Sequence, residues 1–169
     1  ALLNLPCIDI HLGYMCVKTI TSFPESSPAI DGAVSLFNSN NGRLLLIADA
    51  KEITARRTAT ASFLATQLLA FKKWKNEQKE NAILTNYSWL CRNMTHAINL
   101  QSDYSSKLNN IEILKDLNDN RIQQSDVICT CTASEEALIG LKQVKKGVHI
   151  NAVGSFRETM RELADDLML

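Results

Sequence analysis

Apolar and polar positions along the first third of the chain follow a pattern that predicts strands. Residues 13–23 are rich in β-branched side chains, with Lys18 inside the run. Residues 32–48 contain two apolar arms on either side of the polar stretch NSNNG, in which Gly42 can supply the positive φ that a tight turn needs. This part of the chain therefore predicts a strand followed by a β-hairpin.

A helix is predicted next, over residues 53–75, with Asp49 or Thr54 as its cap. Its first two turns are crowded with small residues, and its later part is amphipathic. Two basic residues and a hydroxyl residue would lie in the first turn, where free backbone N–H groups and the helix dipole favour anions: Arg56, Arg57 and Thr58. A guanidinium there could clamp a carboxylate or phosphate, and a solvent-exposed arginine pair is the alternative.

The remaining part of the chain predicts short strands that alternate with helical segments. The expected strands lie at 82–90, 125–134 and 148–153, a helix is expected at 107–118, and the end of the chain reads as the start of a connecting helix. Strands and helices that alternate in this way favour a parallel, doubly wound sheet. The hairpin-rich first third does not fit that pattern, so two domains are predicted, 1–68 and 69–169.

Composition narrows the classes of function. The 169 residues hold 18 Lys and Arg against 18 Asp and Glu, so no net charge recruits nucleic acid or an anionic membrane. No apolar run approaches the roughly 18 residues of a membrane span, and no signal peptide opens the chain, so a cytoplasmic protein is expected. A start at Ala1 instead of Met suggests a processed or excised segment.

Five cysteines are an odd number without the spacing of a disulfide framework or a metal site. Cys129 and Cys131 are too close along one strand to bridge easily, and no second pair of ligands accompanies them. We therefore expect buried free thiols in a reducing compartment, and no metal site.

Asn151 is a polar residue inside the apolar run 148–153, which stops at Gly154. A buried amide needs hydrogen-bond partners, because an unpaired one costs about 1–3 kcal/mol. At the carboxyl end of a parallel strand it could reach a ligand in the crevice where such sheets bind their ligands. Neighbouring groups of the chain could equally satisfy it, and the spacing leaves both alternatives open.

Three stretches, in this order along the chain, together resemble one protein family. They are GRLLLIADAKEITARRTATASFLATQLLA, SDVICTCTAS and KGVHINAVGSFRETMREL. The first is similar to a hairpin that leads into an Arg-Thr helix, the second to a strand ending in Thr and Ser, and the third to a strand ending in Asn-Ala-Val-Gly. Over about 13–69 and 123–166 the chain resembles the ornithine cyclodeaminase/mu-crystallin family, as a diverged or truncated member.

The resemblance implies an α/β fold: a Rossmann-like parallel sheet domain, here shortened, joined to a partial α+β dimerisation and substrate domain. Such proteins bind NAD or NADP, assemble as homodimers and act on small amino, imino or oxo acids. They reduce cyclic ketimines, interconvert amino acids and oxo acids, or cyclise ornithine. All of these reactions move a hydride at an amino- or imino-carbon next to a carboxylate, and the cofactor carries the hydride.

The resemblance also implies roles for individual residues. Lys18 would hold the substrate carboxylate or exchange a proton with its amine, and Arg57 would bind the carboxylate. The residues implied for the cofactor are Thr58 near the phosphates and, on the ribose and nicotinamide side, Thr130, Thr132, Ser134, Asn151, Val153 and Ser155, with Gly154 in the same rim. Because Ser155 stands where ornithine cyclodeaminases place an aspartate, a mu-crystallin-like or alanine-dehydrogenase-like protein is favoured over a cyclodeaminase.

The glycine-rich turn that should follow the first Rossmann strand is missing from the expected place. Thr85 and Tyr87 fall where its first two glycines would be, and a Tyr side chain would occupy space that the pyrophosphate needs. Two hypotheses follow. Dinucleotide binding is lost and the chain is a non-catalytic binding or interaction protein on the same scaffold, or residues 85–93 form a rebuilt phosphate site with Ser88, Arg92 and Asn93 as donors.

Overall fold

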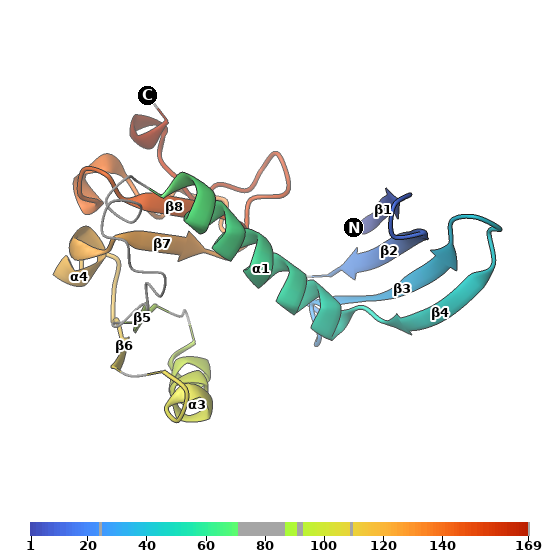
Figure 1. Cartoon of the computed structure of the whole chain (residues 1–169). Coiled ribbons are helices and arrows are strands. Elements are labelled where there is room, and N and C mark those ends of the chain that lie inside the picture. The colour runs from blue at the N-terminus through green and yellow to red at the C-terminus, as the bar shows by residue number, and fades with distance from the viewer. Residues whose placement is uncertain (24, 71–86, 91–92, 109, 169) are drawn as a thin grey trace. The chain divides into compact units, whose positions relative to one another are not determined.

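The computed structural model describes residues 1–23, 25–70, 87–90, 93–108 and 110–168. They form two compact units, which we call unit 1 (Ala1–Ala61) and unit 2 (Ser62–Leu169). One helix, α1, contributes residues to both units (Figure 1). The functional domains expected at 1–68 and 69–169 stay predictions.

Unit 1 is built on a four-stranded antiparallel sheet in which the strands lie in chain order (Figure 1). Its strands are β1 (Leu2–Asp9), β2 (Tyr14–Ser22), β3 (Ile30–Asn38) and β4 (Leu44–Asp49). The predicted strand and hairpin are confirmed, and Gly42 has a φ of 71°. The sequence did not predict β1, which contains Pro6. An edge strand tolerates a proline because one side of its backbone has no neighbouring strand to bond.

In the second half of β2 every second residue is buried. Lys18, Ile20 and Ser22 are buried, whereas the residues between them are half-buried. The antiparallel register places Leu5 of β1 and Val34 of β3 directly opposite Lys18. Since side chains of opposed residues share a face of the sheet, the lysine stands among apolar neighbours.

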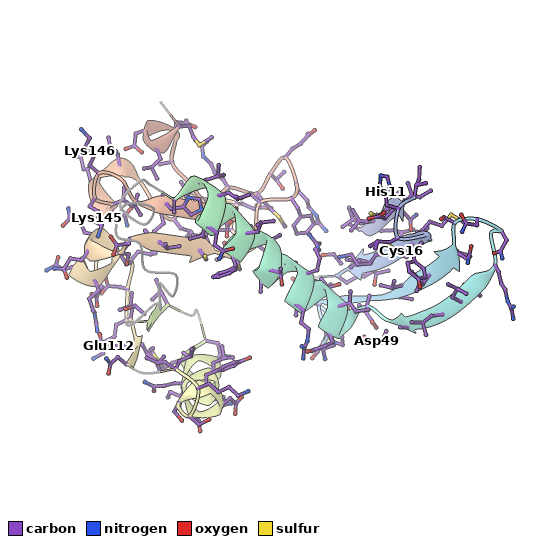
Figure 2. All side chains as sticks on the ribbon, in the orientation of Figure 1. His11, Cys16, Asp49, Glu112, Lys145 and Lys146 are labelled. Carbon is purple, nitrogen blue, oxygen red and sulfur yellow. The ribbon has the colours of Figure 1, made fainter. Side chains whose placement is uncertain are left out.

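Helix α1 (Lys51–Leu69) begins two residues before its predicted start. The carboxylate of Asp49, which stands at the entry to the helix in Figure 2, accepts a hydrogen bond from the backbone N–H of Lys51 at 2.6 Å. Arg57 and its neighbour Arg56 consequently lie in the second turn. The expectation that free N–H groups surround them is wrong, because the free N–H groups of a helix belong to its first turn. Residues 71–75 of the predicted helix lie outside the described residues.

The described residues of unit 2 contain two pairs of parallel strands. β5 (Tyr87–Trp89) pairs with β6 (Ile111–Ile113), and β7 (Val127–Thr130) pairs with β8 (His149–Ala152). Besides the end of α1, the described residues of unit 2 form the helices α3 (Met94–Tyr104) and α4 (Asn120–Gln124) and the 3₁₀ turns η1 (Leu141–Gln143) and η2 (Asp165–Leu167). Parallel pairing is therefore confirmed. Within the described part of the chain the two pairs form separate sheets and not one continuous sheet.

The helix predicted at 107–118 is wrong. The segment 107–118 contains strand β6, and the helix of this region is α3, which ends at Tyr104. Asn110 has a φ of 55°, a left-handed conformation that interrupts a helix and that Asn adopts more readily than most residues. At the end of the chain, Leu163 forms a bridge with Ile139 and is followed by η2. The core of unit 2 packs around Ile139, and Leu163 lies against it.

Candidate functional site

Unit 1 contains a buried amine without a partner. The side chain of Lys18 belongs to a residue that is 8% exposed, and its Nζ has no hydrogen-bond partner among the described residues. Burial, and to a smaller extent the positive charge of Arg57, lower the pKa of Lys18 below its usual 10.5. A buried ammonium with no partner is costly unless an anion or a hydrogen-bond acceptor joins it. Lys18 is therefore suited to meet a ligand anion or to exchange a proton.

The two neighbouring arginines of α1 have different surroundings. Arg56 forms an exposed ion pair with Glu52, one helical turn earlier, at 2.7 Å. Arg57 is exposed and forms no ion pair within the described residues, so its guanidinium is available to an anion. The predicted cofactor residue Thr58 follows it and is half-buried. Lys18 and Arg57, the two residues that the sequence predicted for the substrate, thus both lie in unit 1, near enough for the charge of Arg57 to lower the pKa of Lys18.

Unit 2 contains a buried carboxylate that the sequence did not single out. Glu162 is 1% exposed and accepts four hydrogen bonds. Its Oε1 accepts from the backbone N–H of Thr132 at 2.5 Å and from the Thr132 hydroxyl at 2.8 Å. Its Oε2 accepts from the Thr130 hydroxyl at 2.9 Å and from the backbone N–H of Gly154 at 2.8 Å. One carboxylate therefore joins the ends of β7 and β8.

These hydrogen bonds keep Glu162 ionised. Burial raises the pKa of this carboxyl, but the hydrogen bonds from Thr132, Gly154 and Thr130 outweigh that effect and leave the pKa below its usual 4.5. A carboxylate that accepts several backbone and hydroxyl protons is stabilised in its charged form. The signal that could have identified it was Arg-Glu-Leu at 161–163, an acidic residue directly before a core leucine.

Asn151 is buried, and the chain itself satisfies its amide. Its Nδ2 donates to the Thr66 hydroxyl at 2.9 Å and lies 3.4 Å from the Cys129 sulfur, while its Oδ1 is 3.1 Å from Nε2 of His149. Of the two alternatives that the sequence left open, hydrogen bonding within the chain is the one observed. A contact between Asn151 and the nicotinamide stays a prediction.

The other residues predicted for the cofactor surround the ends of β7 and β8. Thr130 is buried, Ser134 and Val153 are half-buried, and Thr132 and Ser155 are exposed. Ser134 is tied to Glu136, because its hydroxyl donates to the Glu136 carbonyl at 2.7 Å. The structure therefore gathers this predicted set at one edge of unit 2, around Glu162.

The predicted phosphate site at 85–93 has a different local structure. Tyr87 lies inside strand β5 and not in a turn after it, so its expected alignment with a loop glycine is wrong. Ser88 lies in the same strand. Asn93 stands directly before α3, where its side chain accepts from the backbone N–H of Thr95 at 3.0 Å and caps that helix. Thr85 and Arg92 lie outside the described residues.

The four cysteines that the structure describes are more accessible than predicted, and Cys91 lies outside the described residues. Cys7, Cys129 and Cys131 are exposed and Cys16 is half-buried, and these four are free thiols. Cys7 lies on the edge strand β1, and Cys129 lies in β7, whose sheet has two strands, so among the described residues each of these strands has one unpaired edge. No group of three or more His, Cys, Asp or Glu side chains in the described ranges could hold a metal ion. None of the described helices combines the length and the apolar character needed to cross a bilayer.

Comparison with known proteins identifies the family. The model of the ornithine cyclodeaminase/mu-crystallin family matches residues 92–169. Ketimine reductase mu-crystallin of Mus musculus is 31% identical over 97% of this chain and 57% of its own length. Delta(1)-pyrroline-2-carboxylate reductase of Bacillus cereus is 28% identical over 95% of this chain and 55% of its own length. The chain thus spans just over half the length of these relatives.

Solved structures confirm the fold class. An archaeal alanine dehydrogenase dimer with bound NAD superposes with a TM-score of 0.79 at 20% identity, covering 99% of this chain and 57% of that protein. Delta(1)-pyrroline-2-carboxylate reductase of Thermococcus litoralis, in complex with NADH and L-proline, gives 0.77 at 20% identity, with 97% and 61% covered. The α/β fold, the matched family model and the relatives that span nearly the whole chain agree: this chain belongs to the ornithine cyclodeaminase/mu-crystallin family.

Proposed function

We propose that the chain belongs to an NAD(P)H-dependent reductase of small cyclic imino acids, with mu-crystallin-like chemistry. The observation that carries this proposal is the buried, unpartnered Nζ of Lys18, with its lowered pKa, close enough to Arg57 to feel its charge. Two cationic groups without an anionic partner among the described residues suit a substrate that carries a carboxylate next to its reacting carbon.

Within this proposal Arg57 binds the substrate carboxylate and Lys18 donates a proton to the imine nitrogen. The exposed guanidinium of Arg57 offers the planar pair of donors that a carboxylate accepts. Because burial and the charge of Arg57 lower its pKa, Lys18 gives up a proton more readily than an ordinary lysine, which suits it to supply the proton that the substrate nitrogen takes up on reduction. Ser155 replaces the acidic residue of a cyclodeaminase, which supports reduction of an imine over loss of ammonia.

The edge of unit 2 around Glu162 fits the nicotinamide and ribose end of the cofactor. The residues predicted for the cofactor that are accessible there are uncharged: the exposed Thr132 and Ser155 and the half-buried Ser134 and Val153. Such groups suit a carboxamide and sugar hydroxyls, and carboxyl ends of parallel strands are where open α/β sheets bind ligands. When bound, NADH or NADPH supplies the hydride, while the residues of the chain bind and orient the reactants.

A second candidate is a non-catalytic protein that binds small carboxylates on this scaffold, and the glycine content favours it. The six glycines are Gly13, Gly32, Gly42, Gly140, Gly147 and Gly154. None lies in 43–139, so the glycine-rich phosphate turn between strand and helix has no counterpart in this stretch. Lys18 and Arg57 would still hold a carboxylate without the dinucleotide.

One experiment separates the two candidates. Purified protein is tested for NADH and NADPH oxidation with Δ1-pyrroline-2-carboxylate, and for thermal shifts with L-proline and pyruvate. The variant Arg57→Ala is compared with Arg56→Ala, a matched control whose native guanidinium is already paired with Glu52.

Reductase function predicts imine-dependent oxidation that falls at least about tenfold in Arg57→Ala, the loss expected when a charge-assisted hydrogen-bonded pair is removed, and that persists in Arg56→Ala. Ligand-dependent thermal shifts without any oxidation, again lost only in Arg57→Ala, would favour the non-catalytic binder. Flat thermal shifts and no oxidation would contradict both candidates.

A further inference from the structure

Glu162 uses the hydrogen-bond donors that two predicted cofactor residues would offer. The hydroxyls of Thr130 and Thr132 each donate to its carboxylate. A hydroxyl carries a single proton, so neither group can donate to a ligand while it donates to Glu162. As hydrogen-bond donors the two threonines therefore act within the chain, on Glu162.

The geometry requires a carboxylate at this position and not merely a polar side chain. Each oxygen accepts from one backbone N–H, Oε1 from Thr132 and Oε2 from Gly154. A glutamine has one amide nitrogen in place of an oxygen, and in either orientation that nitrogen would face a backbone N–H. Two donors would then oppose each other in a buried place, which leaves both unsatisfied.

The segments that Glu162 joins are far apart in sequence. It lies 32 residues after Thr130 and 8 residues after Gly154, and it contacts the turns that follow β7 and β8. These turns carry the accessible residues Ser134, Val153 and Ser155. Regular strand pairing stops at Thr130 and Ala152. Beyond it the Val153 N–H donates to the Thr130 carbonyl at 2.9 Å and the Arg161 N–H to the Ser134 carbonyl at 2.6 Å, and the Glu162 carboxylate adds the side-chain hydrogen bonds that tie the two turns to each other.

We propose that Glu162 is a positioning residue, whose ionised carboxylate holds the turns after β7 and β8 in the shape that receives the nicotinamide end of NADH. This inference rests on the proposed reductase function. Glu162 itself contacts no ligand, since it is 1% exposed and both of its oxygens are occupied by the chain.

The test compares Glu162→Gln with Glu158→Gln, which makes the same chemical change at an exposed position four residues earlier. Hydrogen exchange is measured at the amides of Thr132 and Gly154, and NADH affinity is measured by fluorescence titration. Glu162→Gln should speed exchange at both amides and raise the Kd for NADH by about tenfold or more, as expected when hydrogen bonds to a buried charge are lost. Glu158→Gln should match the wild type in both measurements.

A second variant covers the outcome in which Glu162→Gln does not fold. Thr130→Val keeps the carboxylate and both backbone donors but removes one hydroxyl, so it should give a smaller change in the same direction in both measurements. If NADH binds the wild type and these variants with equal Kd, the positioning role is overturned and the reductase proposal stands. If NADH fails to bind the wild type at all, the reductase proposal is overturned together with the inference that rests on it.

Discussion

The backbone of Thr132 occupies the place where a side chain on Gly154 would begin. A Cβ built on Gly154 would lie 2.0 Å from the carbonyl oxygen of Thr132 and 2.4 Å from its nitrogen, distances far inside van der Waals contact. The contacted atoms are backbone, so no side-chain rotation could relieve the overlap. The two turns can therefore approach each other closely only with a glycine at 154. The hydrogen bonds of Glu162 to both turns depend on that approach.

Gly154→Ala should therefore destabilise unit 2. Relief of the overlap would move one turn away from the other and stretch the bond from the Gly154 N–H to Glu162, at a cost of about 1–3 kcal/mol or more in the free energy of unfolding. Urea denaturation measures this loss. Gly140→Ala is the matched control, because a Cβ at Gly140 would meet its nearest neighbour at 3.5 Å; an equal loss in both variants would contradict the explanation.

Lys18→Met should make the protein more stable. A methionine of similar length fills the same place without a buried charge, so we expect a gain of about 1 kcal/mol or more in the free energy of unfolding at neutral pH. The pKa of Lys18 is lower in the folded chain than in the unfolded chain, so between that lowered value and 10.5 the unfolded state binds more protons. Wild-type stability should consequently rise with pH across this window.

Denaturation midpoints at neutral pH and near pH 10 measure this effect. The advantage of Lys18→Met over the wild type should shrink as the pH rises, since the wild-type lysine loses its buried charge. A constant difference between the two proteins at all pH values would show that the charge of Lys18 is not the cause.

Arg57→Met should raise the pKa of Lys18 without restoring its ordinary value. The charge of Arg57 is the smaller of the two causes that lower this pKa, and burial, the larger cause, is still present in the variant. NMR titration of protein with ¹³C-labelled lysine reports the shift directly. Arg56→Met should leave the titration of Lys18 unchanged, and an equal shift in both variants would indicate a general loss of charge on the helix.

Asn151→Asp should destabilise the protein near neutral pH more than at mildly acidic pH. The Thr66 hydroxyl already donates to the Ser62 carbonyl at 2.9 Å, so it accepts from the Asn151 amide and has no proton to give to a carboxylate. A buried aspartate at this position would therefore have a raised pKa, and the stability that its protonated form retains is lost as the pH rises through that value. Denaturation at about pH 5 and pH 7, compared with the wild type, measures the difference; equal losses would contradict it.

The sequence predicted the elements whose signal is local. The hairpin around Gly42 and the strands β7 and β8 follow from short apolar runs bounded by turn residues, and the structure contains them. The helix expected at 107–118 does not form. Its helical periodicity is weak, and the backbone at Asn110 is left-handed, which interrupts a helix. Strand β1 was not predicted because its apolar residues do not alternate with polar ones and because it includes Pro6.

Residues of the candidate site could be predicted from the sequence, but the hydrogen bonds that join them could not. The resemblance singled out Thr130 and Thr132, yet nothing in the sequence shows that both hydroxyls donate to a residue about 30 positions later. Glu162 lies in the third stretch of the resemblance, but the donors that stabilise its charge come from residues 130–132 and 154, which its own segment does not show. The buried state of Lys18 similarly depends on the strands beside it, β1 and β3, and not on its own segment.

The order of the strands has a consequence for the time course of folding. In unit 1 each strand pairs with the next one along the chain, so every loop that must close is short and the sheet can grow by adding hairpins. In unit 2, pairing of β7 with β8 must close the loop formed by residues 131–148. The hydrogen bonds to Glu162 require a further closure, because this residue lies 32 positions after Thr130. During refolding we expect amides of β2 and β3 to gain protection from exchange before the amides of Thr132 and Gly154.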